Sequence, residues 1–203
     1  MRFPLLLTTA ALVAAAGVAQ EPTKAANATP GTFRSYVVLD QRTDPKDPKG
    51  KRNVAGFEHD LIVSNELNPT VAVFSRIAKP DDATAKLVAK LKELSAAHKT
   101  LEFGAYLFFP VLDKVYADDA KAKATADDLQ KWGEAIPVGP VVLGLSEKES
   151  DQTKAWELPD TGLLVVFYNR HKVIKKWKLD DTAALTDEVL AALAAEVNKE
   201  LKK

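Results

Sequence analysis

The chain has no cysteine in its 203 residues. Dithiol exchange, disulfide isomerisation and thiol-dependent peroxide reduction all need a thiolate, so none of them can occur on this polypeptide. Disulfides and a lipid-modified cysteine are excluded in the same way, and we expect the folded part to be held by a hydrophobic core alone. An excess of one charge is also missing, because 28 Lys and Arg balance 28 Asp and Glu. This balance argues against a nucleic-acid-binding surface.

The first 19 residues predict a secretory signal peptide. Arg2 gives a positive start, an apolar run of about 14 residues extends from Leu5 to Val18, and the small residues Gly17 and Ala19 suit a cleavage site. The apolar run is shorter than the roughly 20 residues that a membrane-spanning helix needs, and a retained anchor is the alternative. We therefore expect a secreted or periplasmic protein, whose mature chain has a net charge of about −1 once Arg2 is removed.

Residues 20–32 are rich in Ala, Pro, Thr and Asn without an apolar period, which predicts a disordered tether. A single domain is expected over 33–203, beginning with a β extension at 33–66. Within it, 33–39 predicts a strand and Leu61–Val63 a short edge strand. The stretch 40–53 predicts a solvated, charged loop, whose aspartates lack the spacing of a calcium-binding loop.

From Thr70 onward, strands and helices alternate. Continuous apolar runs predict strands at 71–74, 101–109, 140–145 and 163–167. Pro110 is expected to end the second of these strands, and 172–178 returns from the last as a hairpin. Amphipathic spacing predicts helices at 82–98, from a capping box at Thr125, and from Thr186. This order favours an α/β fold with a mixed sheet and helices on both faces.

Two segments carry a resemblance to a known fold. One is Val73-Phe74-Ser75-Arg76-Ile77-Ala78-Lys79-Pro80-Asp81; the other runs from Leu163 to Val173. Together with the order of elements, they resemble the thioredoxin-like fold, a three-layer α/β/α sandwich that ends in a β-hairpin and a helix. The strand at 140–145 is similar to an insertion found in redoxin and peroxiredoxin relatives.

The resemblance also marks where the chain departs from active members. Pro80 falls on the proline of the redox motif, while Ala78 and Asp81 fall on its two cysteines, with Lys79 between them. Gly162 stands at the place of the cis-proline that helps to shape the substrate groove. The resemblance therefore implies a degenerate redox motif and puts the usual mode of peptide binding in question.

Other candidate residues surround this motif. Arg76, Lys79, Asp82 and Thr161 form a possible binding surface, with a solvated helix start as the simpler interpretation. Ser75 is a candidate nucleophile, and the adjacent pair His59 and Asp60 is a candidate base or ligand pair. No catalytic set, metal site or cofactor is predicted, because no group of three or four metal ligands and no glycine-rich phosphate loop occurs.

Three hypotheses follow. The favoured one is an exported thioredoxin-like domain without thiol redox activity, acting as a binding or structural module for another exported protein or peptide. The alternative is a hydrolase or other enzyme with a non-thiol site near the loop 75–82. The third is that the extension between Phe33 and Val63 docks a partner.

Overall fold

A computed structural model describes residues 28–44, 47–51, 54–65, 67–114 and 120–202. The predicted signal peptide and the tether as far as residue 27 lie outside the described residues. No helix in the described part is long and apolar enough to cross a membrane. Where the predicted tether meets the domain, Ala28 forms an isolated β-bridge with Lys172, and the buried Thr29 donates a backbone hydrogen bond of 2.8 Å to His171.

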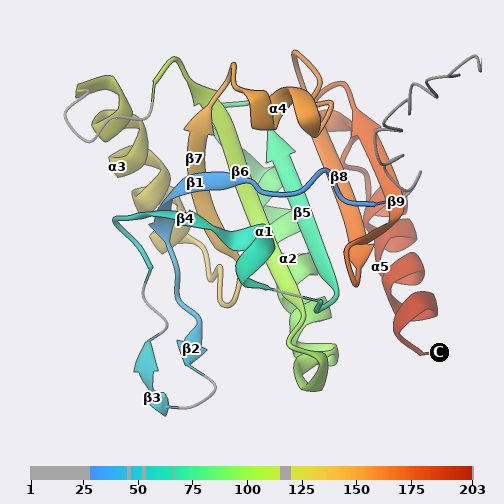
Figure 1. Cartoon of the computed structure of the whole chain (residues 1–203). Helices are drawn as coiled ribbons and strands as arrows, with labels where there is room; N and C mark the ends of the chain where they lie inside the picture. The colour runs from blue at the N-terminus through green and yellow to red at the C-terminus, as the bar shows by residue number, and fades with distance from the viewer. Residues whose placement is uncertain (1–27, 45–46, 52–53, 66, 115–119, 203) are drawn as a thin grey trace, which may run out of the picture.

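A seven-stranded mixed sheet forms the centre of the molecule (Figure 1). Its strand order is β4-β1-β7-β6-β5-β8-β9, in which β5, β6 and β7 run parallel and the remaining pairs are antiparallel. The strands are β1 Arg34–Leu39, β4 Glu58–Asp60, β5 Thr70–Ser75, β6 Gly104–Leu112, β7 Val142–Glu147, β8 Leu163–Asn169 and β9 Lys172–Leu179. The mixed sheet and the closing β8–β9 hairpin are as predicted.

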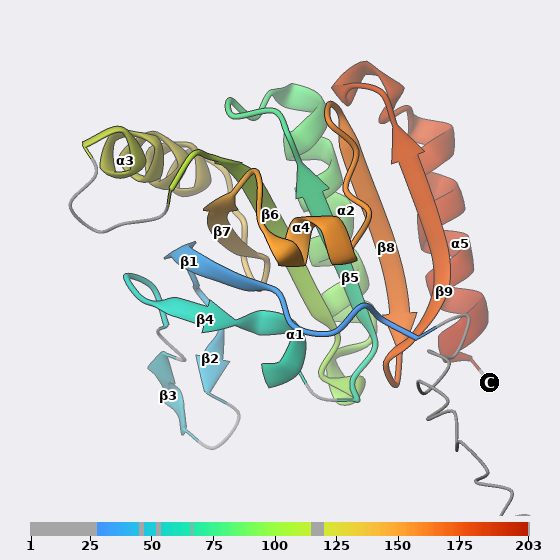
Figure 2. The same ribbon diagram turned by 45° about the horizontal axis from the view of Figure 1, so that its top comes forward.

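Helices cover both faces of this sheet, which gives the expected three layers. In Figure 2, α2 (Asp82–Ala97) and α5 (Asp187–Leu201) lie behind the strands, while α4 (Asp151–Ala155) lies in front of them. On the face of α2 and α5, α3 (Ala120–Ala135) packs beside β1 and β7. The opposite face is covered by α1 (Leu61–Ser64) and α4. Two 3₁₀ turns, η1 (Lys99–Leu101) and η2 (Thr182–Ala184), complete the elements.

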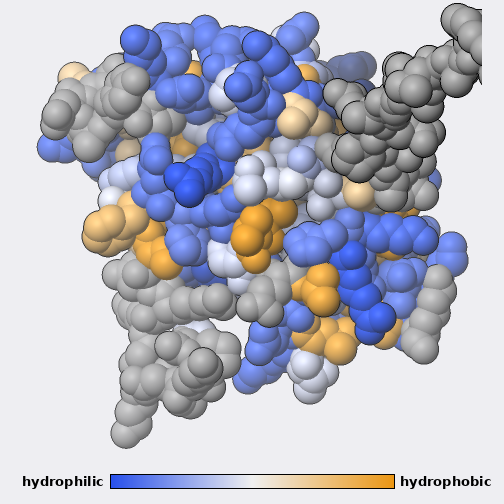
Figure 3. Space-filling model, viewed as in Figure 1, coloured by the Kyte–Doolittle hydropathy of each residue, from blue (hydrophilic) through white to orange (hydrophobic). Residues whose placement is uncertain are grey.

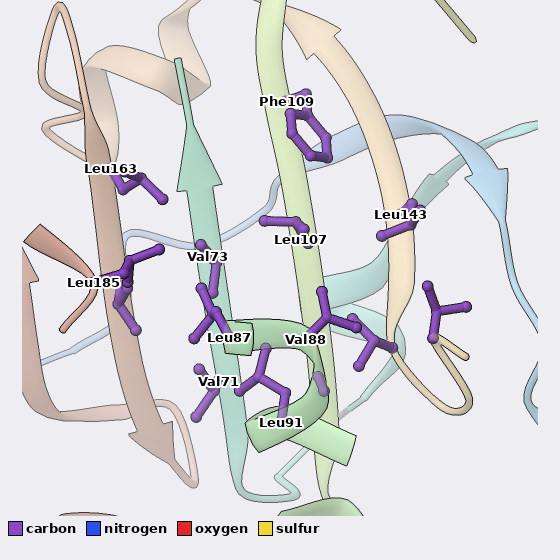
Figure 4. Packing of buried hydrophobic residues seen from close by; sticks show 14 of the residues in the cluster. Val71, Val73, Leu87, Val88, Leu91, Leu107, Phe109, Leu143, Leu163 and Leu185 are labelled. Carbon is purple, nitrogen blue, oxygen red and sulfur yellow. The ribbon is translucent and has the colours of Figure 1, made fainter. Parts of the chain in front are cut away.

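Alternation along the central strands explains why their sequences are apolar throughout. Val71 and Val73 of β5 pack against Leu87 and Leu91 of α2 in the larger core, shown in Figure 4. The intervening residues of β5, Ala72 and Phe74, point to the other face. A strand covered on both faces needs apolar residues at every position.

The second core is aromatic. Phe74 lies at its centre, with ring-centroid distances of 4.8 Å to Phe33, 5.2 Å to Phe108 and 5.0 Å to Trp156. Trp156 directly follows α4 and is fully buried. The sequence did not predict α4, because a helix of five residues carries too short a pattern to recognise.

Three element predictions were wrong in detail. Residues 61–64 form the helix α1 rather than an edge strand, because Asp60 accepts a hydrogen bond from the backbone N–H of Val63 and caps the turn. Strand β6 continues through Pro110 to Leu112: its pairing with β5 ends at Phe108, so no ladder bond to β5 is required of Pro110. Helix α3 includes Thr125 in its interior, where the hydroxyl bonds the Lys121 carbonyl instead of capping.

The stretch predicted as a charged loop contains a small two-stranded sheet, β2 (Thr43–Asp44) and β3 (Asp47–Lys51). The stretch 40–53 was expected to be solvated, but its first residue, Asp40, is buried. The side chain of Asp40 is fully buried and forms two hydrogen bonds of 2.9 Å with the guanidinium of Arg42. Burial lowers the pKa of Arg42, but its hydrogen bond to Asp40 and the charges of Tyr106 and Asp40 raise it by more. The net pKa therefore lies above its usual value, and the guanidinium stays charged.

Candidate functional site

The predicted site lies at the carboxyl edge of the parallel strands. The loop from Arg76 to Asp81 joins the end of β5 to the start of α2. In open α/β sheets this edge is where ligands bind. Ala78 and Lys79 are exposed there, and Pro80 is half-buried. The segment that the resemblance aligns with the redox motif therefore lies between the central sheet and the first long helix.

Arg76 is the residue that organises this edge. Its Nε donates to the carbonyl of Pro159 at 3.0 Å, and its Nη1 donates to the carbonyls of Pro110 at 2.8 Å and Lys148 at 2.6 Å. The acceptors belong to β6, to the turn after β7 and to the segment before β8. Guanidinium–carbonyl bonds of this kind are charge-assisted and geometrically specific. Arg76 therefore ties three strand ends together.

Gly162 lies directly beside this tie. Its carbonyl accepts a 2.9 Å hydrogen bond from the backbone N–H of Arg76, and its φ of +77° lies in the region that favours glycine. A Cβ at this position would approach the carbonyl oxygen of Leu179 to 2.1 Å. No peptide bond in the described ranges is cis. The place assigned to a cis-proline thus holds a glycine that its surroundings require.

Asp81 is the N-cap of α2. One carboxylate oxygen accepts hydrogen bonds of 2.9 Å from the backbone N–H and from the hydroxyl of Thr84, and the other accepts one of 2.5 Å from Thr182. Burial raises the pKa of Asp81, but the hydrogen bonds from Thr182 and Thr84 lower it by more, so the net pKa lies below its usual value. Asp81, which the resemblance aligns with the second cysteine, is therefore a helix-capping carboxylate.

The four residues of the predicted binding surface are only partly available. Lys79, Asp82 and Thr161 are exposed, whereas Arg76 is half-buried and already bonded to three carbonyls. Backbone pairing between Arg76 and Gly162 does bring Thr161 to this edge. The sequence interpretation of Arg76 as part of a binding surface missed its carbonyl acceptors, which have no signature in the side-chain pattern.

Ser75 is not placed to act as a nucleophile. Its side chain is buried, and its hydroxyl forms hydrogen bonds with the backbone N–H and carbonyl of Ile77, at 3.2 and 3.4 Å. His59 does not join it, because β4 is separated from β5 by three strands of the sheet. The structure therefore does not bring together the candidate nucleophile Ser75 and the candidate base His59.

His59 instead contacts Ser64, a pair that the sequence analysis did not single out. The histidine Nε2 lies 2.9 Å from the Ser64 hydroxyl, which also donates to the carbonyl of Asp60. The contact joins the last residue of α1 to β4.

No group of three or more His, Asp or Glu side chains among the described residues could hold a metal ion. Asp60 is occupied by the backbone N–H groups of Val63 and Phe33, at 3.0 and 3.4 Å. His98, the last residue before η1, bonds Asn198 of α5 at 2.8 Å.

Comparison with solved structures supports the fold assignment. The chain is similar to a candidate thiol:disulfide interchange protein DsbE from Chlorobium tepidum, with 11% identity and a TM-score of 0.53 over 84% of this chain and 94% of that one. For a candidate protein disulfide isomerase from Bacteroides thetaiotaomicron, the identity is 14% and the TM-score 0.53, over 87% and 90%. AhpC from Mycobacterium tuberculosis matches with 12% identity and a TM-score of 0.53, over 83% and 95%.

No protein-family description matches the chain, and no curated protein matches its sequence. At these identities the structural likeness shows the fold alone. The chain has a thioredoxin-like fold, as the sequence resemblance implied. It shares this fold with proteins named for thiol chemistry while containing no cysteine.

Proposed function

We propose that the chain is an exported, thioredoxin-like binding or structural module without thiol redox activity. The observation that carries the proposal is the hydrogen bonding of Arg76 and Asp81 at the carboxyl edge of the sheet. Where the fold's reactive loop stands, Arg76 is bonded to three backbone carbonyls and Asp81 caps a helix. Both side chains are engaged in hydrogen bonds within the fold, and Ser75 is buried. What the edge does provide is a set of loops that are hydrogen-bonded to one another through Arg76 and Asp81.

Export is inferred from the Arg2-to-Ala19 pattern, and the partner is inferred to be another exported protein or peptide. Neutral charge and the absence of a basic excess favour a protein partner over a nucleic acid. The exposed residues Lys79, Asp82 and Thr161 remain candidates for contact with it.

The proposal is tested on the full precursor expressed in a bacterium with an export pathway. We expect mass spectrometry of the exported protein to show cleavage after Ala19. The purified protein should leave insulin disulfides and hydrogen peroxide unchanged beyond the buffer rate. Hydrolysis of an ester or peptide substrate that Ser75→Ala abolished would instead establish the enzyme alternative, and retention of the intact precursor in the membrane would contradict export.

A further inference from the structure

A groove of about 930 Å³ runs beside α3, on the face of the sheet that α2 and α5 also cover. Its floor is apolar and includes Val38 of β1, Leu112 of β6 and Leu145 of β7. The wall formed by α3 is lined in part by the small residues Ala122 and Ala126, which leave the space open. No residue of the loop 76–81 lines the groove, so it is distinct from the carboxyl-edge site.

The length of the groove suits an extended chain. The α3 residues that line it run from Ala122 to Glu134 along one face of the helix. At 1.5 Å per residue, this stretch is roughly 18 Å long. An extended peptide rises about 3.3 Å per residue, so five or six residues would fill it. The opposite rim is formed by Phe57 and Glu58, at the start of the edge strand β4.

The charges around the groove are unbalanced. Asp40 lines it but is neutralised by Arg42. Glu58, Asp127 and Glu134 also line it, and no ion pair to any of the three occurs in the described part of the chain. Lys123 is the basic residue among the groove's lining side chains. Three carboxylates against one ammonium group give a rim that attracts cations.

An exposed aromatic side chain completes the rim. Phe57 is 70% exposed, the most exposed of the large apolar residues in the described part. It follows Gly56, whose φ of +88° turns the chain toward β4. In Figure 3, hydrophobic side chains gather at the left end of β4, below α3. An aromatic ring beside an acidic, apolar-floored groove can contact both the stem of a Lys or Arg and its charge.

We propose that this groove binds an extended segment of a partner protein in which apolar side chains alternate with Lys or Arg. The apolar side chains would enter the floor formed by Val38, Leu112 and Leu145, and the cationic groups would meet Glu58, Asp127 and Glu134. This inference names the partner chemistry for the binding role proposed above and rests on that role.

The test uses the mature protein and two fluorescein-labelled hexapeptides, one alternating Leu and Lys and the other alternating Leu and Glu. Fluorescence anisotropy measures their affinities at low and at physiological salt. We expect the Leu–Lys peptide to bind at least tenfold more tightly than the Leu–Glu peptide, with the difference shrinking as salt is added. Equal affinities, or no binding of the Leu–Lys peptide, would overturn the proposal.

Two neighbouring residues on α3 provide a matched control. Asp127 lines the groove and Asp128 does not, although both are exposed. Asp127→Asn should weaken Leu–Lys binding by about two- to fivefold, as expected for one partly screened charge pair, whereas Asp128→Asn should leave it unchanged. Ala126→Phe should abolish binding by filling the groove. Circular dichroism confirms that each variant is folded, and an Ala126→Ser variant, which retains the space, should still bind.

The outcomes separate this inference from the proposed function. If Asp127→Asn and Asp128→Asn behave alike, the peptide does not bind in the groove, and the module must use another surface. If sedimentation shows a dimer that Ala126→Phe dissociates, a second copy occupies the groove and the peptide proposal is wrong. Failure of the binding-module proposal would appear separately, as catalytic turnover in the assays above.

Discussion

Thr182 donates a 2.5 Å hydrogen bond to Asp81, joining two segments that lie 101 residues apart in the sequence. One end of this contact is the N-cap of α2, and the other is the first residue of η2, just before α5. The two helices pack side by side on the same face of the sheet. The contact therefore fixes the start of α2 relative to the segment that leads into α5.

We expect Asp81→Ala to lower the free energy of unfolding by about 1 kcal/mol, the usual effect of losing an N-cap carboxylate. Thr182→Val should have a smaller effect, because it removes only one of the hydrogen bonds to the carboxylate. Urea denaturation of both single variants and the double variant gives the coupling between them. Additive effects would mean that the Asp81–Thr182 contact contributes nothing of its own.

The lowered pKa of Asp81 predicts a pH dependence of stability. In the unfolded chain an aspartate titrates near pH 3.9, and in the folded protein its pKa is lower. The stabilisation by the carboxylate is therefore present above about pH 4 and is lost as the pH falls through the folded-state pKa. Asp81→Asn should remove this part of the acid sensitivity. Parallel urea curves from pH 2.5 to 6 measure it, and identical slopes for the two proteins in the acid range would contradict the prediction.

Because Arg76 joins three segments of the chain, we expect its substitution to lower the free energy of unfolding strongly, although it lies in a loop with exposed neighbours. Arg76→Met preserves the length of the side chain but removes the donors to Pro110, Lys148 and Pro159. We expect a loss of about 2–3 kcal/mol, because charge-assisted bonds are lost and carbonyls are left without donors. Lys79→Met, in the same loop and exposed, should change stability by less than about 0.5 kcal/mol. Similar denaturation midpoints for the two variants would show that Arg76 is not a structural tie.

Features that depend on a local sequence pattern could be predicted, whereas features that depend on contacts between distant residues could not. Strands such as 71–74 and 163–167 were predicted because burial on both faces makes every residue apolar, and Thr186 was found because a cap is a local pattern. The acceptors of Arg76 are backbone carbonyls 34, 83 and 72 residues away, which no local pattern announces. Likewise, the apolar triplet 61–63 suits a strand, whereas the hydrogen bonds from Val63 to Asp60 and from Asn65 to Leu61 hold it as a helix. The groove was missed because its lining residues come from segments far apart in the sequence.

Gly162 provides a third stability test with an internal control. Gly162→Ala introduces a Cβ 2.1 Å from the Leu179 carbonyl oxygen, so the backbone must move, and we expect a loss of about 3 kcal/mol or more. Gly31 also has a positive φ, at +107°, but no atom lies within 4 Å of its added Cβ. Gly31→Ala should therefore cost only the backbone strain, about 1 kcal/mol. Equal losses in thermal or urea denaturation would mean that φ alone, and not the contact with β9, selects glycine at 162.

Because the chain has no native thiol, single cysteines can measure the electrostatic field at the degenerate motif. The N-terminus of α2 carries a partial positive charge, which stabilises a thiolate, and its C-terminus does the reverse. Asp81→Cys places a thiol at the N-cap, and Ala96→Cys places one in the exposed last turn of the same helix. We expect the thiol pKa to be at least about one unit lower at 81 than at 96.

The rate of alkylation by iodoacetamide as a function of pH gives both thiol pKa values directly, since each variant has a single cysteine. Ala78→Cys adds a third position, in the exposed loop three residues before the N-cap. Its pKa should lie between those of the other two, because the field of the helix falls off within its first turn. The ordering 81, then 78, then 96 would show that this loop provides the electrostatic setting for a reactive thiol although the chain contains no cysteine. Equal thiol pKa values at 81 and 96 would mean that the start of α2 does not stabilise a thiolate.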